Sequence, residues 1–435
     1  MSGWLRRQWH LAVLAGWTAV WFVILARHGG IAWKFFVQGT DLLFTGHDGA
    51  SAFQHVYLHI YAEYPQLQIG PVPYPLAELL RLIGPDNGVV PAELLMSFLG
   101  LVVLALIQRI AVAVRPDLAA PADPASADAG LSWLARVGAG RLRLVMLVGG
   151  AVFVMAWEEL AVAYGHLDDA IALTCAVAAV WCWVAAARGS ALVRALLTGV
   201  LLGLAGASKP WAFVFLPVLL LPRRPGDAGA PAHQPGWWRR ADLTYRLIAV
   251  GGVAAASLAA WLPFFVADPH TTQAMHWQIA NMPDSALRAL GVHAAMTPSW
   301  DRSVQIVLGC VLGAVAAARR RWAAVVLLGA GARIALDPGV HGYYTPEVMV
   351  GALLWDLLGP RRPVPCWSLA GFAALNLAPL ITHDGAVLGD IRLGVIVAFT
   401  AAILLAPARW YWRPDSGGDT PVPQPAGPAL SGRPA

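Results

Sequence analysis

Long apolar runs, separated by short polar segments, recur along almost the whole chain. Most of them reach the 18 or so residues, about 30 Å of helix, that cross the hydrocarbon core of a membrane. The first predicted helix covers about 20 residues from Leu11. The further spans are predicted near 91–113, 143–163, 169–187, 194–208, 210–222, 244–266, 303–318, 322–336, 342–359, 366–382 and 388–408.

This pattern predicts an all-α integral membrane protein with about twelve transmembrane helices. The number falls to ten if 194–222 forms a tight hairpin, because each half of that segment is short for a full crossing. Residues 1–413 then form one membrane domain. The Pro- and Gly-rich tail, 414–435, is expected to be disordered.

Two long segments separate apolar runs on the predicted outer side, 28–90 and 267–302. Within the first, short helices are expected at 51–64 and 76–83, joined by a Pro-rich passage that forbids a regular helix. Neither helix contains a 20-residue apolar run, the length of about one crossing. We therefore expect both of them to lie along the membrane interface.

Composition supports a membrane protein. Of the 435 residues, 58% are hydrophobic and only 13% are charged, too few to cover the polar surfaces of the soluble domains that such a length would make. Soluble, disordered and nucleic-acid-binding proteins are therefore excluded. The net charge of +5 does not indicate a nucleic-acid partner, because the basic residues are spread over many short loops.

Charged residues divide between the two sides of the predicted membrane. With the N-terminus inside, most arginines, including those of the linkers 114–142 and 223–243, lie on the cytoplasmic side, as the positive-inside rule requires. Ten of the twelve histidines then lie at the outer face, together with many acids. Ionisable groups at membrane depth are costly, so these are the candidates for function.

Two candidate sites lie in the first outer segment. Asp41 follows the first helix, where a carboxylate can act as a general base or simply cap a helix. His55, His59 and Glu63 recur every four residues and share one face of a helix. That face could bind zinc, or it could be the polar side of an interfacial helix.

Further acids lie at the ends of predicted spans. Glu159 ends one span, and the turn that follows carries His166, Asp168 and Asp169. Acids in the first turn of a helix are favoured by its dipole, so helix capping and substrate binding both explain the two aspartates. His166 has no such structural explanation.

Two cations lie inside apolar segments. Lys209 stands between two apolar helices, and Arg333 lies near the outer end of another. Such a lysine is costly unless an acid or a phosphate pairs with it, and the arginine could also extend to the interface. Both are candidates for an anionic lipid headgroup. The outer turn after Arg333 adds Asp337, His341, Tyr343 and Tyr344, which together could form a carbohydrate or phosphate pocket or contribute to the interfacial aromatic belt.

The layout resembles the C-type (GT-C) membrane glycosyltransferases, which have an acid after the first helix and a long first outer loop with two interfacial helices. The motifs Thr40-Asp41-Leu42, Tyr61 and Tyr74-Pro75-Leu76 are similar to those of the polyprenyl-phosphate-mannose-dependent mannosyltransferases. The segments 165–173 and 198–217 also resemble that group. Phe44 is a departure, because the family often has tyrosine there.

The resemblance implies transfer of a sugar, mannose or another pyranose or pentose, from a polyprenyl-phosphate donor to a glycan, glycolipid or protein acceptor. Asp41 is then the base that deprotonates the acceptor hydroxyl. The scheme needs no metal or other cofactor, and its other partners are membrane lipids. The resemblance also implies that the chain lies in the plasma membrane, which is the inner membrane of a bacterium. The candidate substrate-binding residues are Lys209, Arg333, His166, Asp168, Asp169, Glu159, His59, Asp337, His341, Tyr343 and Tyr344.

Two other functions remain open at this stage. A transporter or lipid flippase would show paired repeats and charged residues near the bilayer midplane, whereas here the polar residues gather on one side. A non-catalytic relative that binds a lipid-linked sugar would keep the same pocket without performing the transfer.

Overall fold

The computed structural model describes residues 3–45, 56–84, 86–115, 118, 132–184, 190–221, 240–360 and 362–407. Helices dominate this part of the chain, which contains no strand, and Ala280 and Met296 form an isolated β-bridge. The predicted all-α class is therefore confirmed. The predicted tail at 414–435, and most of both predicted linkers, lie outside the described residues.

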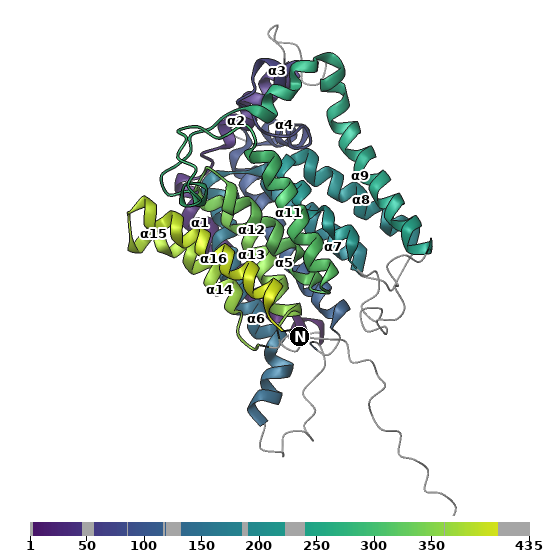
Figure 1. The fold of residues 1–435 in the computed structure, drawn as a ribbon, viewed down its shortest axis with the longest axis vertical. Coiled ribbons are helices and arrows are strands. Elements are labelled where there is room, and N and C mark those ends of the chain that lie inside the picture. The colour runs from purple at the N-terminus through teal and green to yellow at the C-terminus, as the bar shows by residue number, and fades with distance from the viewer. Residues whose placement is uncertain are drawn as a thin grey trace, which may run out of the picture.

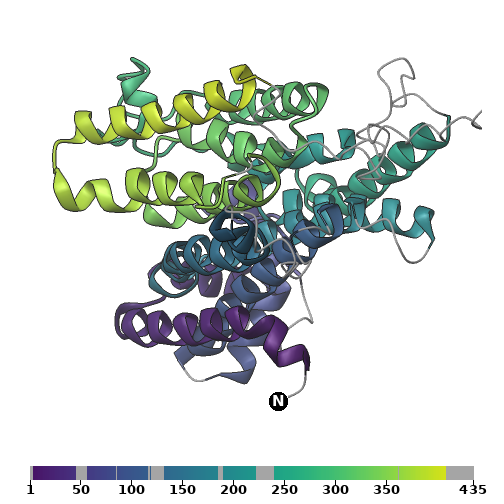
Figure 2. The ribbon, with the colours of Figure 1, turned by 90° about the horizontal axis from the view of Figure 1, so that it is seen from below.

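Eight helices of the described chain are long and apolar enough to cross a membrane, which confirms a polytopic membrane protein. They are α1 (Gly3–Leu25), α5 (Val89–Val114), α6 (Ser132–Glu158), α7 (Leu167–Val184), α8 (Ala191–Ser208), α9 (Arg240–Ala267), α11 (Asp301–Ala318) and α16 (Gly385–Leu405). Figure 2 shows α1 and α16 on opposite sides of the bundle, with α8 and α9 projecting from it.

The other four predicted spans also coincide with helical segments, but these are shorter. They are the 3-10 helix η7 (Pro210–Leu220), α12 (Val325–Leu336), α13 (Thr345–Leu358), and α14 (Cys366–Phe372) with its continuation to α15 (Ala378–Ile381). Residues 194–222 thus form a long helix followed by a short one. The total of twelve crossings stays a prediction.

The centre of the bundle is formed by α12 and α13, in which every residue is buried. Helix α12 packs against α11, α13 and α16, while α13 packs against α6 and α14. The 3-10 turn η12 (Gly342–Tyr344) joins α12 to α13. Arg333 and Glu347, the charged residues of α12 and α13 on either side of this turn, are therefore enclosed by protein.

Short helices gather at the end of the molecule opposite the N-terminus (Figure 1). These are α2 (Trp33–Thr40), α3 (Ile60–Glu63) and α4 (Pro73–Ile83). Helix α4 begins three residues before the predicted start, because proline is tolerated in the first turn of a helix. Helix α3 occupies the last part of the predicted helix 51–64, whose first five residues lie outside the described ones.

The first outer segment is fastened to the ends of two membrane helices. Near its start, the amides of Gly30 and Ala32 donate to the carbonyls of Val162 (2.8 Å) and Tyr164 (2.7 Å). Further on, the Gly70 amide donates to the carbonyl of Ser208 at 3.0 Å. A Cβ on Gly70 would lie only 1.9 Å from a backbone oxygen of α8, so glycine permits this approach. The loop therefore lies directly over the end of α8.

Candidate functional site

A π-helical segment, η6 (Glu159–Tyr164), and a left-handed glycine shape the turn between α6 and α7. Gly165 has φ +72°, which glycine adopts without strain. The amides of Gly165 and His166 both donate to the carbonyl of Leu160, at 3.0 and 3.1 Å. This turn places His166 and the two aspartates of the first turn of α7 at the end of α8.

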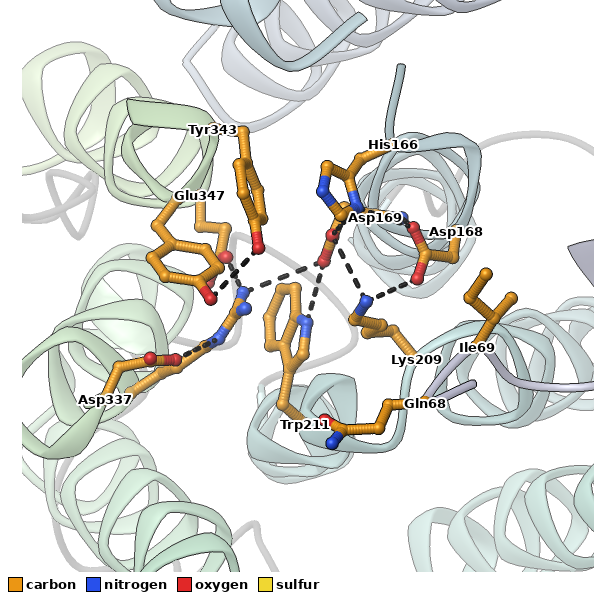
Figure 3. A network of polar contacts seen from close by, with 12 residues as sticks. Gln68, Ile69, His166, Asp168, Asp169, Lys209, Trp211, Asp337, Tyr343 and Glu347 are labelled. Atoms are coloured by element: carbon orange, nitrogen blue, oxygen red, sulfur yellow. Dashed lines mark hydrogen bonds and ion pairs between the residues drawn. The ribbon is translucent and has the colours of Figure 1, made fainter. Parts of the chain in front are cut away.

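Lys209, at the end of α8, lies against these acids. Its ammonium group pairs with the carboxylate of Asp168 and lies 3.6 Å from Oδ2 of Asp169. Nδ1 of His166 lies 3.3 and 3.5 Å from oxygens of the same two carboxylates. Both aspartates are fully buried, so the lysine provides the counter-charge that burial demands (Figure 3). Neither aspartate serves as a conventional N-cap, because helix α7 begins before them.

Arg333 links this group to the outer turn. Its guanidinium group lies 3.7 Å from Asp169 and 3.4 Å from Asp337, and it pairs with Glu347. It is also enclosed by two aromatic rings, since its central carbon lies 4.2 Å from the ring centroid of Trp211 and 4.4 Å from that of Tyr344. The arginine is 3% exposed and does not extend to the interface.

These contacts form one ionic network of four carboxylates and two cations. Its acids are Asp168, Asp169, Asp337 and Glu347, and its cations are Lys209 and Arg333. The indole of Trp211 also donates to Asp169 at 2.9 Å. The network therefore carries no surplus of positive charge, although its cations were expected to receive an anion.

Aromatic rings cover one side of the network. The His166 and Tyr343 rings stack at 3.8 Å, and His341 stacks on Tyr343 at 5.3 Å with an angle of only 7° between the ring planes. The Tyr343 hydroxyl donates to that of Tyr344 at 3.1 Å. Partial desolvation lowers the pKa of the His341 imidazole, against the opposing effect of Asp337.

A cavity of about 630 Å³ opens beside the network. Its polar wall is formed by Lys209, Arg333, Asp337 and the aromatic side chains of the turn 341–344. Arg302 and Gln68 also line the cavity. Aromatic side chains from the first outer segment and from α9, such as Phe35 and Trp261, supply an apolar wall. The cavity thus offers charged, aromatic and apolar surfaces to one ligand.

Asp41 does not line this cavity. It lines a separate hollow of about 550 Å³, where Arg81 contacts its carboxylate at 2.9 Å. Arg81 is held in turn by the buried Glu78, at 2.8 and 2.9 Å, and this hydrogen bonding raises the pKa of the guanidinium group. The hollow is lined by Trp33 and neighbouring residues of α2 and the cavity by Phe35 and Phe36, so different faces of α2 serve the two.

Two other predicted site residues also lie outside the network. Glu159 accepts a hydrogen bond from Asn376 at 2.9 Å. His59 contacts Asp268 at 3.2 Å, and His270 contacts the other oxygen of that carboxylate at 3.0 Å. The backbone amide of His270 and the His59 ring hold the pKa of Asp268 below its ordinary value. His59 therefore ties α3 to the loop after α9.

Among the described residues, one group of side chains could hold a metal ion. Ligand atoms of His166, Asp168 and Asp169 lie within 4.8 Å of one another. Such a set of one imidazole and two carboxylates suits a divalent cation. The ammonium of Lys209 reaches the same two carboxylates, so an ion would have to share them with the lysine.

Four contributors to the site are not among the residues predicted from the sequence: Glu347, Trp211, Arg302 and Gln68. Glu347 gave a signal, because it is an acid near one end of an apolar span, as Glu159 is. Arg302 is the second residue of α11, where an arginine is an ordinary flank of a membrane span. Gln68 is brought to the cavity only by the approach of the first outer segment to α8.

The fold and the site together define a polytopic membrane protein with a buried ionic network and a cavity at one end of its helices. No family model matches the chain, and no curated protein matches it. The chain is similar to the crystal structure of ArnT from Cupriavidus metallidurans bound to undecaprenyl phosphate, at 14% identity and a TM-score of 0.38. The match covers 93% of this chain and 77% of ArnT.

Proposed function

We propose that this chain is a membrane glycosyltransferase that takes a sugar from a polyprenyl-phosphate donor at the outer face. The observation that carries the proposal is the cavity of about 630 Å³, in which cations, stacked aromatic rings and an apolar wall meet. A lipid-linked sugar has three matching parts, a phosphate, a sugar ring and a polyprenyl chain. Cations suit the first, aromatic rings the second and apolar side chains the third.

The reaction is an inverting displacement. The acceptor hydroxyl oxygen attacks the anomeric carbon and loses its proton to a base, while the bond from that carbon to the phosphate oxygen breaks. The electron pair leaves with the lipid phosphate, whose developing charge is stabilised by nearby cations. His166, Tyr343 and Tyr344, which line the cavity, are the proposed contacts of the sugar. The base of this proposal is Asp41, which must reach the acceptor from the other side of α2.

Mannose is the sugar that the motifs around Asp41 favour, and a cell-envelope glycan or glycolipid is the proposed acceptor. The proposal therefore rests on the cavity and on the sequence motifs.

The proposal is tested by transfer from radiolabelled polyprenyl-phosphate mannose in membranes that contain this protein. We expect label to enter an envelope glycan or glycolipid, and membranes without the protein to show none of this incorporation. Polyprenyl-phosphate donors of other sugars, assayed in parallel, identify the sugar. If no donor gives incorporation above the control membranes, the proposed activity is wrong.

A further inference from the structure

Arg302 differs from the other cations of the cavity in its contacts. Its Nη2 donates to the side-chain oxygen of Gln68 and, at 3.1 Å, to the backbone oxygen of Trp277. Both acceptors are neutral. Among the described residues no carboxylate lies within ion-pair distance of Arg302, and the charges of Asp301 and Asp337 act on it from farther away. Its Nε and Nη1 make no hydrogen bond within that part of the chain.

Lys209 and Arg333, in contrast, are already paired with carboxylates of the network. Lys209 faces two buried carboxylates, and Arg333 faces Asp337 and Glu347 in addition to Asp169. An anion that approached either cation would also approach these acids, and at such distances the repulsion offsets the attraction. The network is therefore suited to holding its own parts together, and poorly suited to binding a phosphate.

Arg302 is accessible from the cavity. It is half-buried at the start of α11 and lines the cavity together with Gln68 and Trp211, two residues that Figure 3 shows at the network. A ligand bound against the network is thus within reach of the guanidinium group. Arginine is suited to such a ligand, because its planar fork matches phosphate oxygens with two parallel hydrogen bonds.

We propose that Arg302 is the residue that binds the phosphate of the lipid ligand in this cavity. The inference rests on the proposed function, since it specifies which cation receives the lipid phosphate monoester or diester. The phosphate oxygens take the place of Gln68 on the guanidinium fork and use Nε and Nη1 as well. Lys209 and Arg333 then act as positioning residues that fix the acids and aromatic rings around the sugar.

The proposal is tested by measuring the affinity of the purified full-length protein for undecaprenyl phosphate and for undecaprenol, which lacks the phosphate. The wild type is expected to prefer the phosphate. Arg302→Gln should lose about tenfold or more of that preference, the size of a charge-assisted contact. Arg302→Lys should retain part of it, because the charge remains without the fork. Arg27→Gln, which removes an exposed arginine in the 3-10 turn just after α1, should behave as wild type.

A second variant avoids the risk that Arg302→Gln fails to fold. Gln68→Glu keeps the side-chain size and gives Arg302 an acidic partner, so the contact is strengthened while the phosphate preference falls. Equal preference in wild type, Arg302→Gln and Gln68→Glu overturns the assignment of Arg302 but leaves the proposed function standing. A wild type that does not prefer the phosphate refutes the proposed lipid ligand itself. Inorganic phosphate is expected to compete weakly; competition as strong as that of the lipid overturns the assignment to a lipid.

Discussion

Replacing Arg333 by methionine should destabilise the protein by about 3–5 kcal/mol, the cost of leaving buried charges without their partner. The fully buried Glu347 has no other ion-pair or hydrogen-bond partner in the described chain. Asp337 and Asp169 would each lose a contact as well. The rings of Trp211 and Tyr344 would lose the guanidinium group between them. Denaturant unfolding of the purified protein in detergent measures the loss.

Three variants identify the cause of that loss. Adding Glu347→Gln to Arg333→Met should recover much of the stability, because the charge that lost its partner is then absent. Arg333→Lys should give an intermediate result, since lysine keeps the charge but not the planar stacking. Arg27→Met, the same change at an exposed arginine, should leave the unfolding midpoint unchanged. Equal midpoints for the Arg27 and Arg333 variants would show that the network contributes nothing to stability.

Periodicity and composition were enough to predict most of the fold. Each predicted span coincides with a helix, because an apolar run of this length in a membrane must satisfy its backbone internally. What the sequence does not contain is the depth of each helix. The segments 210–220 and 325–336 are as apolar as the others but too short to cross alone. The helices packed around these two segments determine whether they are shielded from water and lipid, and that packing is a property of the tertiary structure.

The residues of the site were easier to predict than their contacts. Charge inside apolar segments identified Lys209 and Arg333, and the turns identified most of the acids and tyrosines around them. Sequence spacing could not show that Asp168, Asp169 and Glu347 neutralise these cations, because each pair joins two different helices and the contact depends on how those helices pack. For the same reason it could not place Asp41 in a different hollow or bring Gln68 to Arg302.

Asp41→Asn should lower glycosyl transfer by about 100-fold or more, the contribution of a general base, while the affinity for the lipid donor stays unchanged. The affinity should not change because Asp41 lies outside the cavity. The substitution keeps the size of the side chain and removes its basicity. Asp390→Asn, at an exposed acid of α16, is the matched control and should retain full activity. Initial rates of transfer and donor binding are measured on the same membrane preparations.

The same pair of measurements tests whether α2 moves during catalysis. Arg81 and Glu78 hold Asp41 with its side chain 49% exposed in its own hollow, so this carboxylate is open to an acceptor but separated from the cavity. A large loss of transfer with unchanged binding requires α2 to shift when both substrates are present. Full activity in Asp41→Asn, combined with a loss in Asp301→Asn or Asp337→Asn, would instead assign the base to the cavity, where both acids lie. The hollow of Asp41 would then have no part in the chemistry, and α2 would be a fixed wall between that hollow and the cavity.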